Sequence, residues 1–106
     1  MMLRRGKAWT VHDRDGNEVY LTWERWGHIL DFHPRMAPFF DELQHTVQSG
    51  RRRQDQMLPY KYFYVRSFDH LPIDSNVIVA VVLVNVRTGE HFVTTAYLHW
   101  MESMRK

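Results

Sequence analysis

The chain has no cysteine among its 106 residues. This absence excludes disulfide scaffolds, cysteine-based zinc sites and thiol nucleophiles, and it fits a reducing compartment. Long apolar runs are also missing, since the most apolar one, residues 77–84, is far too short to cross a bilayer of about 30 Å as a helix. We therefore expect a cytoplasmic protein with no membrane contact and no signal peptide. Its chemistry must come from histidine, carboxylate, arginine, lysine, hydroxyl and phenol groups.

The composition is that of one globular domain spanning residues 1–106. The chain is 44% hydrophobic, 14% aromatic and 25% charged, with five glycines and four prolines, and it has no repeat or low-complexity segment. Lysine and arginine number 14 against 12 acidic residues, for a net charge of +2. Most of the basic residues are arginine, whose planar fork of donors suits phosphate. The balance therefore permits an anionic partner without requiring one.

The first third of the chain predicts a hairpin and a helix. Residues 9–12 and 18–21 are short β-prone runs around an Asp-Gly pair, which is a strong turn signal. Thr22 then stands at an expected helix N-cap, followed by one apolar stripe formed by Trp23, Trp26, Ile29 and Leu30. This helix should end near His33, because Pro34 disfavours a helical conformation in the residue before it.

The rest of the chain predicts a second helix and three strands. The helix carries the apolar stripe Met36, Phe39, Phe40, Leu43 and Val47, with Gly50 as its C-cap. The charge run of residues 51–55 is expected to be a loop, and residues 60–68, 77–86 and 91–98 are expected to be strands. The predicted fold is α+β: an N-terminal hairpin, two helices, then a three-stranded antiparallel meander with the helices on one face.

A candidate site follows from strict alternation along the predicted strands. Tyr64 and Arg66 share one face of the first meander strand, and one face of the last carries His91, Val93, Thr95, Tyr97 and His99. The opposite face of the last strand, with Phe92, Thr94, Ala96 and Leu98, is expected to face the core. If the polar face lies near Arg66, a phosphate-binding cation stands beside groups that move protons. The alternative is structural, because tyrosine and threonine favour strands and arginine favours solvated faces.

Two histidines of the first predicted helix are further candidates, since histidine serves as acid or base near neutral pH. His33 would lie with the apolar stripe and face the sheet, whereas His28 would lie on the polar side. Their five-residue spacing does not place both imidazoles on one helical face, which argues against a zinc site. Arg51, Arg52 and Arg53 form either a solvated basic loop or a contact to an anionic backbone. The sequence has no Gly-rich phosphate loop, paired-carboxylate motif or nucleophile elbow.

The segment 19–34 carries Val-Tyr-Leu-Thr-x-x-Arg-Trp-x-His-Ile-Leu-x-x-His-Pro, and a Tyr-x-Arg strand and a terminal Thr-Thr-Ala-Tyr follow it. In this order it resembles phage- and mobile-element-associated nucleases of the barnase, EndoU, colicin and RelE-like group. The resemblance spans roughly residues 19–97. Its most specific pieces are the His-Ile-x-x-x-His-Pro segment and the terminal Thr-Ala-Tyr.

The resemblance implies metal-independent cleavage of RNA by attack of a ribose 2′-oxygen, with no cofactor. It assigns His28 or His33 to acid–base work, Arg66 to phosphate stabilisation, and Thr95 with Tyr97 to a terminal hydroxyl pair. Tyr64, next to Arg66 on its strand face, and the three consecutive arginines, because of their charge, are the candidate substrate-binding residues. A toxin with an acidic antitoxin or immunity protein is the implied setting. The alternative is a non-catalytic module of the same fold that binds nucleic acid or protein.

Overall fold

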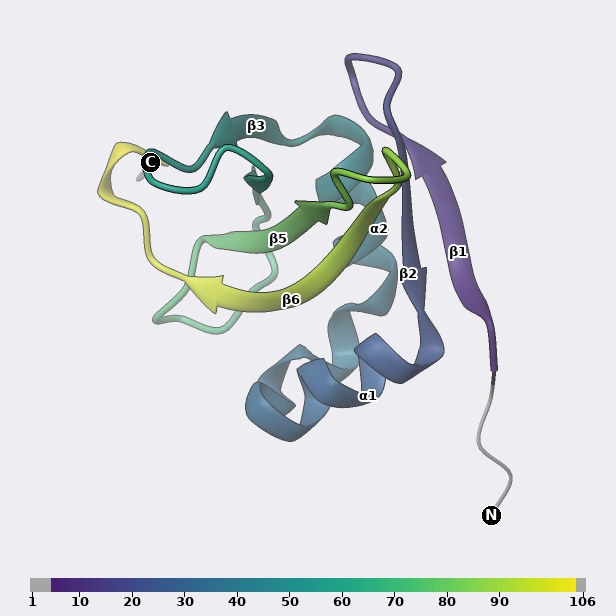
Figure 1. Ribbon diagram of the computed structural model, residues 1–106. Helices are drawn as coiled ribbons and strands as arrows, with labels where there is room; N and C mark the ends of the chain where they lie inside the picture. The colour runs from purple at the N-terminus through teal and green to yellow at the C-terminus, as the bar shows by residue number, and fades with distance from the viewer. Residues whose placement is uncertain (1–4, 105–106) are drawn as a thin grey trace.

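The computed structural model describes residues 5–104, which form one six-stranded mixed sheet with helices against it (Figure 1). The strand order is β1-β2-β6-β5-β4-β3, and all neighbours are antiparallel except β2 and β6. The elements are β1 (Lys7–His12), β2 (Glu18–Thr22), α1 (Trp23–Phe32), η1 (Pro34–Phe39), α2 (Phe40–Ser49), β3 (Arg51–Gln54), β4 (Lys61–Ser67), β5 (Val77–Val84), β6 (His91–His99) and η2 (Glu102–Met104). The α+β content is as predicted, but the predicted three-stranded antiparallel meander is wrong.

The first reason is that the N-terminal hairpin joins the sheet. Val19 pairs with His91 and Tyr20 with Phe92, in parallel, so β2 becomes the neighbour of β6. A two-stranded hairpin is marginally stable alone, and this one buries Val19 and Leu21 completely. Local pattern predicts the hairpin but not the strand that it pairs with.

The second reason is β3, the strand formed by the arginine run that we expected to be a loop. Arg51 pairs with Val65 and Arg52 with Tyr64, so backbone pairing with β4 outweighs the low apolar content of the run. The Arg52 guanidinium lies 3.7 Å from the centroid of the Tyr62 ring, which gives the charged side chain an aromatic surface to cover. Charged side chains are also common on exposed edge strands, where they discourage pairing with other chains.

The first helix begins and ends as predicted, and the second begins later. The backbone N–H of Arg25 donates to Thr22 Oγ1 at 3.1 Å, which is the predicted N-cap, and α1 ends immediately before His33. Residues 34–39 form a 3₁₀ helix, because Pro38 has no N–H to donate within an α-helix. The C-cap Gly50 has φ −72°, outside the left-handed region. Glycine is needed there because a Cβ would collide with backbone carbonyls of neighbouring elements.

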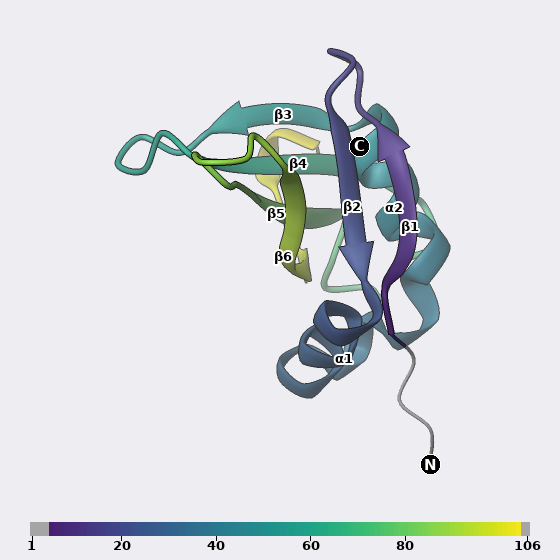
Figure 2. The ribbon, with the colours of Figure 1, turned by 45° about the vertical axis from the view of Figure 1, so that its right-hand side comes forward.

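The core lies between one face of the curved sheet and the helices (Figure 2). Alternate residues of the central strands, Val19, Leu21, Tyr64, Ile78, Ala80, Val82, Val93 and Ala96, meet the helical residues Ile29, Met36, Phe39, Leu43 and Val47. The packing of α2 against β1, β4 and β5 leaves the other sheet face for a site. Within residues 5–104 no helix is long and apolar enough to span a membrane.

Candidate active site on the open face of the sheet

A β-bulge in β6 decides which of its side chains reach the open face. In the pairing of β5 with β6, Val82 pairs with Val93 but its neighbour Val81 pairs with Thr95. The register therefore shifts by one residue, and Thr94 has no partner in β5. As a result Val93 and Ala96 are both fully buried in the core. The predicted common face of Val93 and Thr95 is therefore wrong. Beyond the bulge, Thr95, Tyr97 and His99 lie on the face opposite the core.

The bulge is held by Arg25, which sequence pattern did not single out as a structural residue. Its Nη2 donates to the Thr94 carbonyl at 2.7 Å and to Thr94 Oγ1 at 3.1 Å, and its Nε donates to the same carbonyl at 3.2 Å. The described pairing between β2 and β6 ends at Phe92, so the next part of this β6 edge has no strand beside it. The Arg25 side chain therefore provides the hydrogen bonds that the Thr94 carbonyl would otherwise have to accept from water.

The open face carries a groove of about 310 Å³, which we call the open-face groove. Arg51 and Arg53 of β3 line this groove. Arg52, between them, points to the other side of the strand. The full lining is Arg51, Arg53, Phe63, Val65, Val79, Tyr97, His99, Met101, Ser103 and Met104. Cations, aromatic rings and an apolar floor thus meet in one concave site.

Two imidazoles lie beside the Tyr97 ring, and one of them, that of His99, lines the groove. The His33 ring centroid lies 5.7 Å from that of Tyr97, and the His99 centroid lies 6.3 Å away at an interplanar angle of 82°. His33 reaches this position because α1 ends beside the open edge of β6. The sequence prediction that His33 faces the sheet agrees with this contact.

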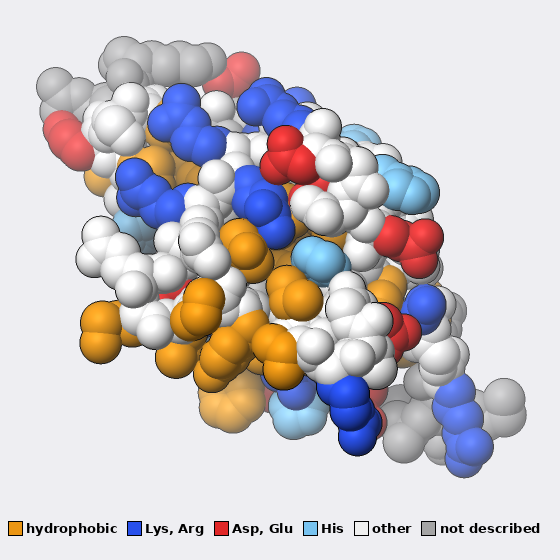
Figure 3. All heavy atoms as spheres, turned by 45° about the horizontal axis from the view of Figure 1, so that its top comes forward, with side chains coloured by type: hydrophobic (Ala, Val, Ile, Leu, Met, Phe, Trp, Pro, Cys, Tyr) orange, Lys and Arg blue, Asp and Glu red, His pale blue; other side chains and the backbone are white. Residues whose placement is uncertain are grey.

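The electrostatics of the open-face groove favour an anion. Of the described residues that line it, Arg51 and Arg53 are permanently charged, His99 gains charge on protonation, and none carries a carboxylate. Figure 3 views the molecule from the side on which β3 lies, and it shows Lys and Arg side chains gathered above a group of hydrophobic side chains. A ligand with phosphate groups and apolar faces matches this surface.

Three predicted site residues lie on the core side of the sheet. Arg66 pairs with Ile78 on the core face, and its guanidinium lies 4.6 Å from the centroid of the Phe68 ring. Tyr64 is fully buried, and Arg52 donates from Nε to the Tyr64 hydroxyl at 3.1 Å. The sheet therefore separates Arg66, Tyr64 and Arg52 from the open-face groove.

Tyr64 belongs to a buried polar network with the hairpin turn. Its hydroxyl donates to Asp13 Oδ2 at 2.5 Å, and Asp13 also accepts from the backbone N–H groups of Asp15 and Asn17. Burial acts to raise the pKa of Asp13, but hydrogen bonds, the largest from Tyr64, outweigh it and lower the pKa. Burial and the Asp13 carboxylate raise the pKa of Tyr64. The network ties the hairpin to β4 and is structural.

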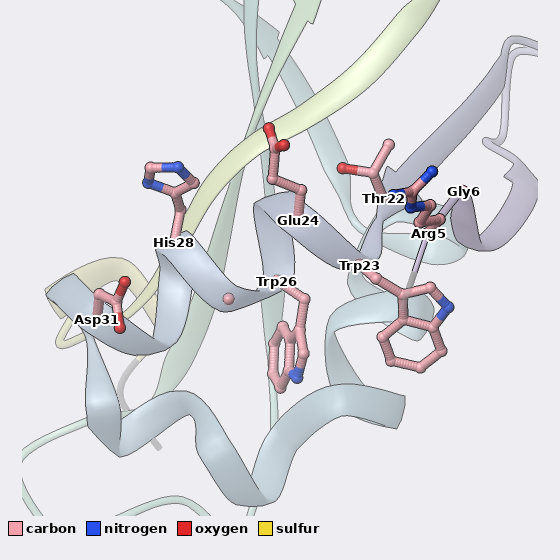
Figure 4. Close-up of a pocket in the computed structure, with 9 residues that line it drawn as sticks. Arg5, Gly6, Thr22, Trp23, Glu24, Trp26, His28 and Asp31 are labelled. Atoms are coloured by element: carbon pink, nitrogen blue, oxygen red, sulfur yellow. The ribbon is translucent and has the colours of Figure 1, made fainter. Parts of the chain in front are cut away.

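His28 lies on the solvent side of α1, as its place on the helical wheel predicted. It lines a hollow of about 730 Å³ with Glu24 and Asp31. Trp23 and Trp26 also line this hollow, and their indoles project to a different side of the helix from His28 (Figure 4). Both indoles pack on Phe40, at ring distances of 5.4 and 5.1 Å. No group of three or more histidine, aspartate or glutamate residues within residues 5–104 could hold a metal ion. The hollow lacks the convergence of cations seen in the open-face groove.

Comparisons of the chain with protein-family models, with curated proteins and with solved structures gave no match. The nuclease resemblance therefore stays a prediction from short motifs. A proposal for function must rest on the chemistry of the open-face groove.

Proposed function

We propose that this protein is an endoribonuclease that cleaves RNA without a metal ion, by attack of a ribose 2′-oxygen on the adjacent phosphate. The observation that supports it is the convergence of two guanidinium groups, a phenol and the His99 imidazole at one groove, with a second imidazole, that of His33, against the phenol ring. Arginine pairs bind phosphate oxygens, and imidazoles transfer protons near neutral pH. The proposal keeps His33 and Tyr97 from the sequence hypothesis, adds His99, and replaces Arg66 with Arg51 and Arg53; Thr95 does not line the groove and has no role in it.

The reaction needs one base and one acid on opposite sides of the phosphate. One of His33 and His99 accepts the 2′-hydroxyl proton as the 2′-oxygen bonds to phosphorus. The bond from phosphorus to the 5′-oxygen breaks, and the other imidazole donates a proton to that oxygen. The products are a 2′,3′-cyclic phosphate and a 5′-hydroxyl. Arg51, Arg53 and the Tyr97 hydroxyl stabilise the negative charge on the non-bridging oxygens.

The biological setting is part of the proposal. RNA is the substrate, and the cytoplasm is where the protein meets it. An acidic inhibitor protein, as in a toxin and antitoxin pair, would bind over the groove, because carboxylates complement the guanidiniums of Arg51 and Arg53 that line it.

The test is incubation of the purified protein with mixed-sequence RNA in EDTA, with the product ends analysed for a cyclic phosphate. His33→Ala and His99→Ala should each lower the cleavage rate about 10²–10⁴-fold, the range for loss of one acid–base group. Tyr97→Phe and the double variant Arg51→Ala, Arg53→Ala should also lower it. All variants should unfold at temperatures near that of the parent.

Arg66→Ala and His28→Ala are the matched controls, since they remove the same side-chain types away from the groove, and both should cleave at the parental rate. Intact RNA after incubation with folded parent protein would overturn the proposal. So would a loss of activity in Arg66→Ala equal to that in the groove variants.

A non-catalytic RNA-binding module is the second candidate. It is favoured by the apolar floor and the two arginines of the groove, which bind RNA without any need for a reaction. Its result would be RNA binding that weakens with salt and yields no product, because neutralised phosphates release counterions. Cleavage with a cyclic end would rule it out.

A further inference from the structure

The floor of the open-face groove is apolar, which phosphate binding alone does not require. Val79 is only 4% exposed although it lies on the face opposite the core, and Val65 pairs with it across β4 and β5. Phe63 stands beside these valines, half-buried, on the same face of β4. The groove thus combines a hydrophobic base with the two arginines of β3.

The far wall of the groove is the C-terminal segment, which folds back beside the sheet after β6 (Figure 1). Asn76 holds this segment: its Nδ2 donates to the Met101 carbonyl at 2.9 Å, and its Oδ1 accepts from the Met101 N–H at 2.7 Å. The paired bonds set Met101 and Met104 against the groove. Methionine side chains adapt to flat ligands because they are unbranched and polarisable.

We propose that the open-face groove is a nucleobase pocket, in which one base of an RNA strand stacks on Phe63 while its phosphate contacts Arg51 and Arg53. This rests on the proposed function and specifies how the same groove holds its substrate. A flat ring with an attached phosphate is the ligand chemistry that needs both an apolar slot and guanidinium groups at its rim.

Size and charge agree with this occupant. The volume of about 310 Å³ is at the lower end of the range for small-molecule pockets, about 300–1,000 Å³. The Lys61 ammonium lies 5.3 Å from the centroid of the Phe63 ring, which adds a third cation next to the stacking surface. The Ser103 hydroxyl and the His99 imidazole provide hydrogen-bonding groups at the wall for the polar edge of a base.

The test is titration of isotope-labelled full-length protein with uridine 5′-monophosphate and adenosine 5′-monophosphate, followed by NMR. Ribose 5-phosphate, which lacks a base, is titrated in parallel. Neither nucleotide has an internucleotide bond, so binding is measured independently of cleavage. We expect at least one nucleotide to bind about tenfold more tightly than ribose 5-phosphate, since stacking on one aromatic ring contributes a factor of this order. The shifted signals should include Phe63, Val79 and Met104.

Phe63→Ala should reduce the preference for the nucleotide over ribose 5-phosphate to less than threefold, while the double variant Arg51→Ala, Arg53→Ala should weaken both ligands. Met104→Ala, at the half-buried wall, is a second probe of the slot that leaves the sheet intact and should also reduce the preference. Phe32→Ala removes a phenylalanine that is 75% exposed on α1 and should bind as the parent does.

Equal affinity of the parent for nucleotides and ribose 5-phosphate would overturn the base pocket, as would nucleotide shifts confined to residues outside the groove. Nucleotide binding at the groove together with uncut RNA would keep the base pocket and reject the endoribonuclease. Cleavage of RNA by a parent protein that binds nucleotides no more tightly than ribose 5-phosphate would reject the pocket and keep the endoribonuclease.

Discussion

Replacing Arg25 with alanine should destabilise the protein and move Tyr97, although Arg25 is not among the groove residues. The variant loses the donors that hold the Thr94 carbonyl and hydroxyl at 2.7 to 3.2 Å. A hydrogen bond from a charged donor contributes about 1.5–3 kcal/mol. The three contacts share one carbonyl and one hydroxyl on a half-buried edge that water can reach, so we expect a total loss of about 2–3 kcal/mol in unfolding free energy.

Urea denaturation gives this free energy, and thermal denaturation provides a second measure. About 1 kcal/mol corresponds to roughly 4–8 °C in a domain near 100 residues, so Tm should fall by about 8–24 °C. In an NMR spectrum the backbone signals of Thr95 and Tyr97 should shift, because they follow the bulge. Arg25→Lys, which keeps the charge but loses the two-pronged contact, should lie between the parent and Arg25→Ala.

Arg35→Ala is the matched control. Arg35 also makes a two-pronged contact, with Asp74 at 2.6 and 3.1 Å, but both side chains are more than half exposed. Exposed ion pairs contribute little, so this variant should unfold near the parent. If Arg25→Ala lost no more stability than Arg35→Ala and left the Tyr97 signals in place, the argument that Arg25 holds the bulge would be refuted.

Three further predictions concern other parts of the molecule. The pKa of Asp13 is lowered from 3.8 in the folded state, so the stability that its carboxylate contributes is present above that value and is lost as the pH falls. The free energy of unfolding of Asp13→Asn, measured by urea denaturation, should therefore fall less below pH 4 than that of the parent. Tyr64→Phe should cost about 1.5–3 kcal/mol in unfolding free energy, because it removes a hydrogen bond to the buried Asp13 carboxylate; an unchanged urea midpoint would contradict this. For RNA binding, the double variant Arg51→Ala, Arg53→Ala should reduce the slope of log affinity against log salt by about 1.4, the value for two contacts to a single strand; fluorescence anisotropy measures it, and an unaltered slope would place the phosphates elsewhere.

Local signals in the sequence were enough for the hairpin, the start and end of α1, and the strands β4, β5 and β6. Thr22 has the side chain that caps a helix, Pro34 ends one, and Gly16 adopts φ 85° in the predicted turn. These features depend on residues within a few positions of one another, so the chain carries them without reference to its fold.

Part of the candidate site could be predicted in the same way, and part could not. His33 and Tyr97 were named from the helical wheel and from strand alternation, and the structure brings their rings together. Arg66 was grouped with Tyr97 because strict alternation and an assumed register placed them on one face, and the register of the sheet separates them. Arg51 and Arg53 carried the right charge, but assigning them to a loop hid the fact that they alternate on a strand.

The sequence by itself determined the hairpin, the first helix with its cap, and the strands β4, β5 and β6, as well as which residue types are available for acid–base and phosphate chemistry. The tertiary structure decided that β2 pairs with β6, that the arginine run becomes β3, and that the bulge at Thr94 puts Val93 in the core while Tyr97 and His99 lie on the open face. The difference is physical. Propensity, capping and side-chain period act over a few residues, whereas pairing and bulges depend on contacts such as that of Arg25 with Thr94, which are 69 residues apart in the chain.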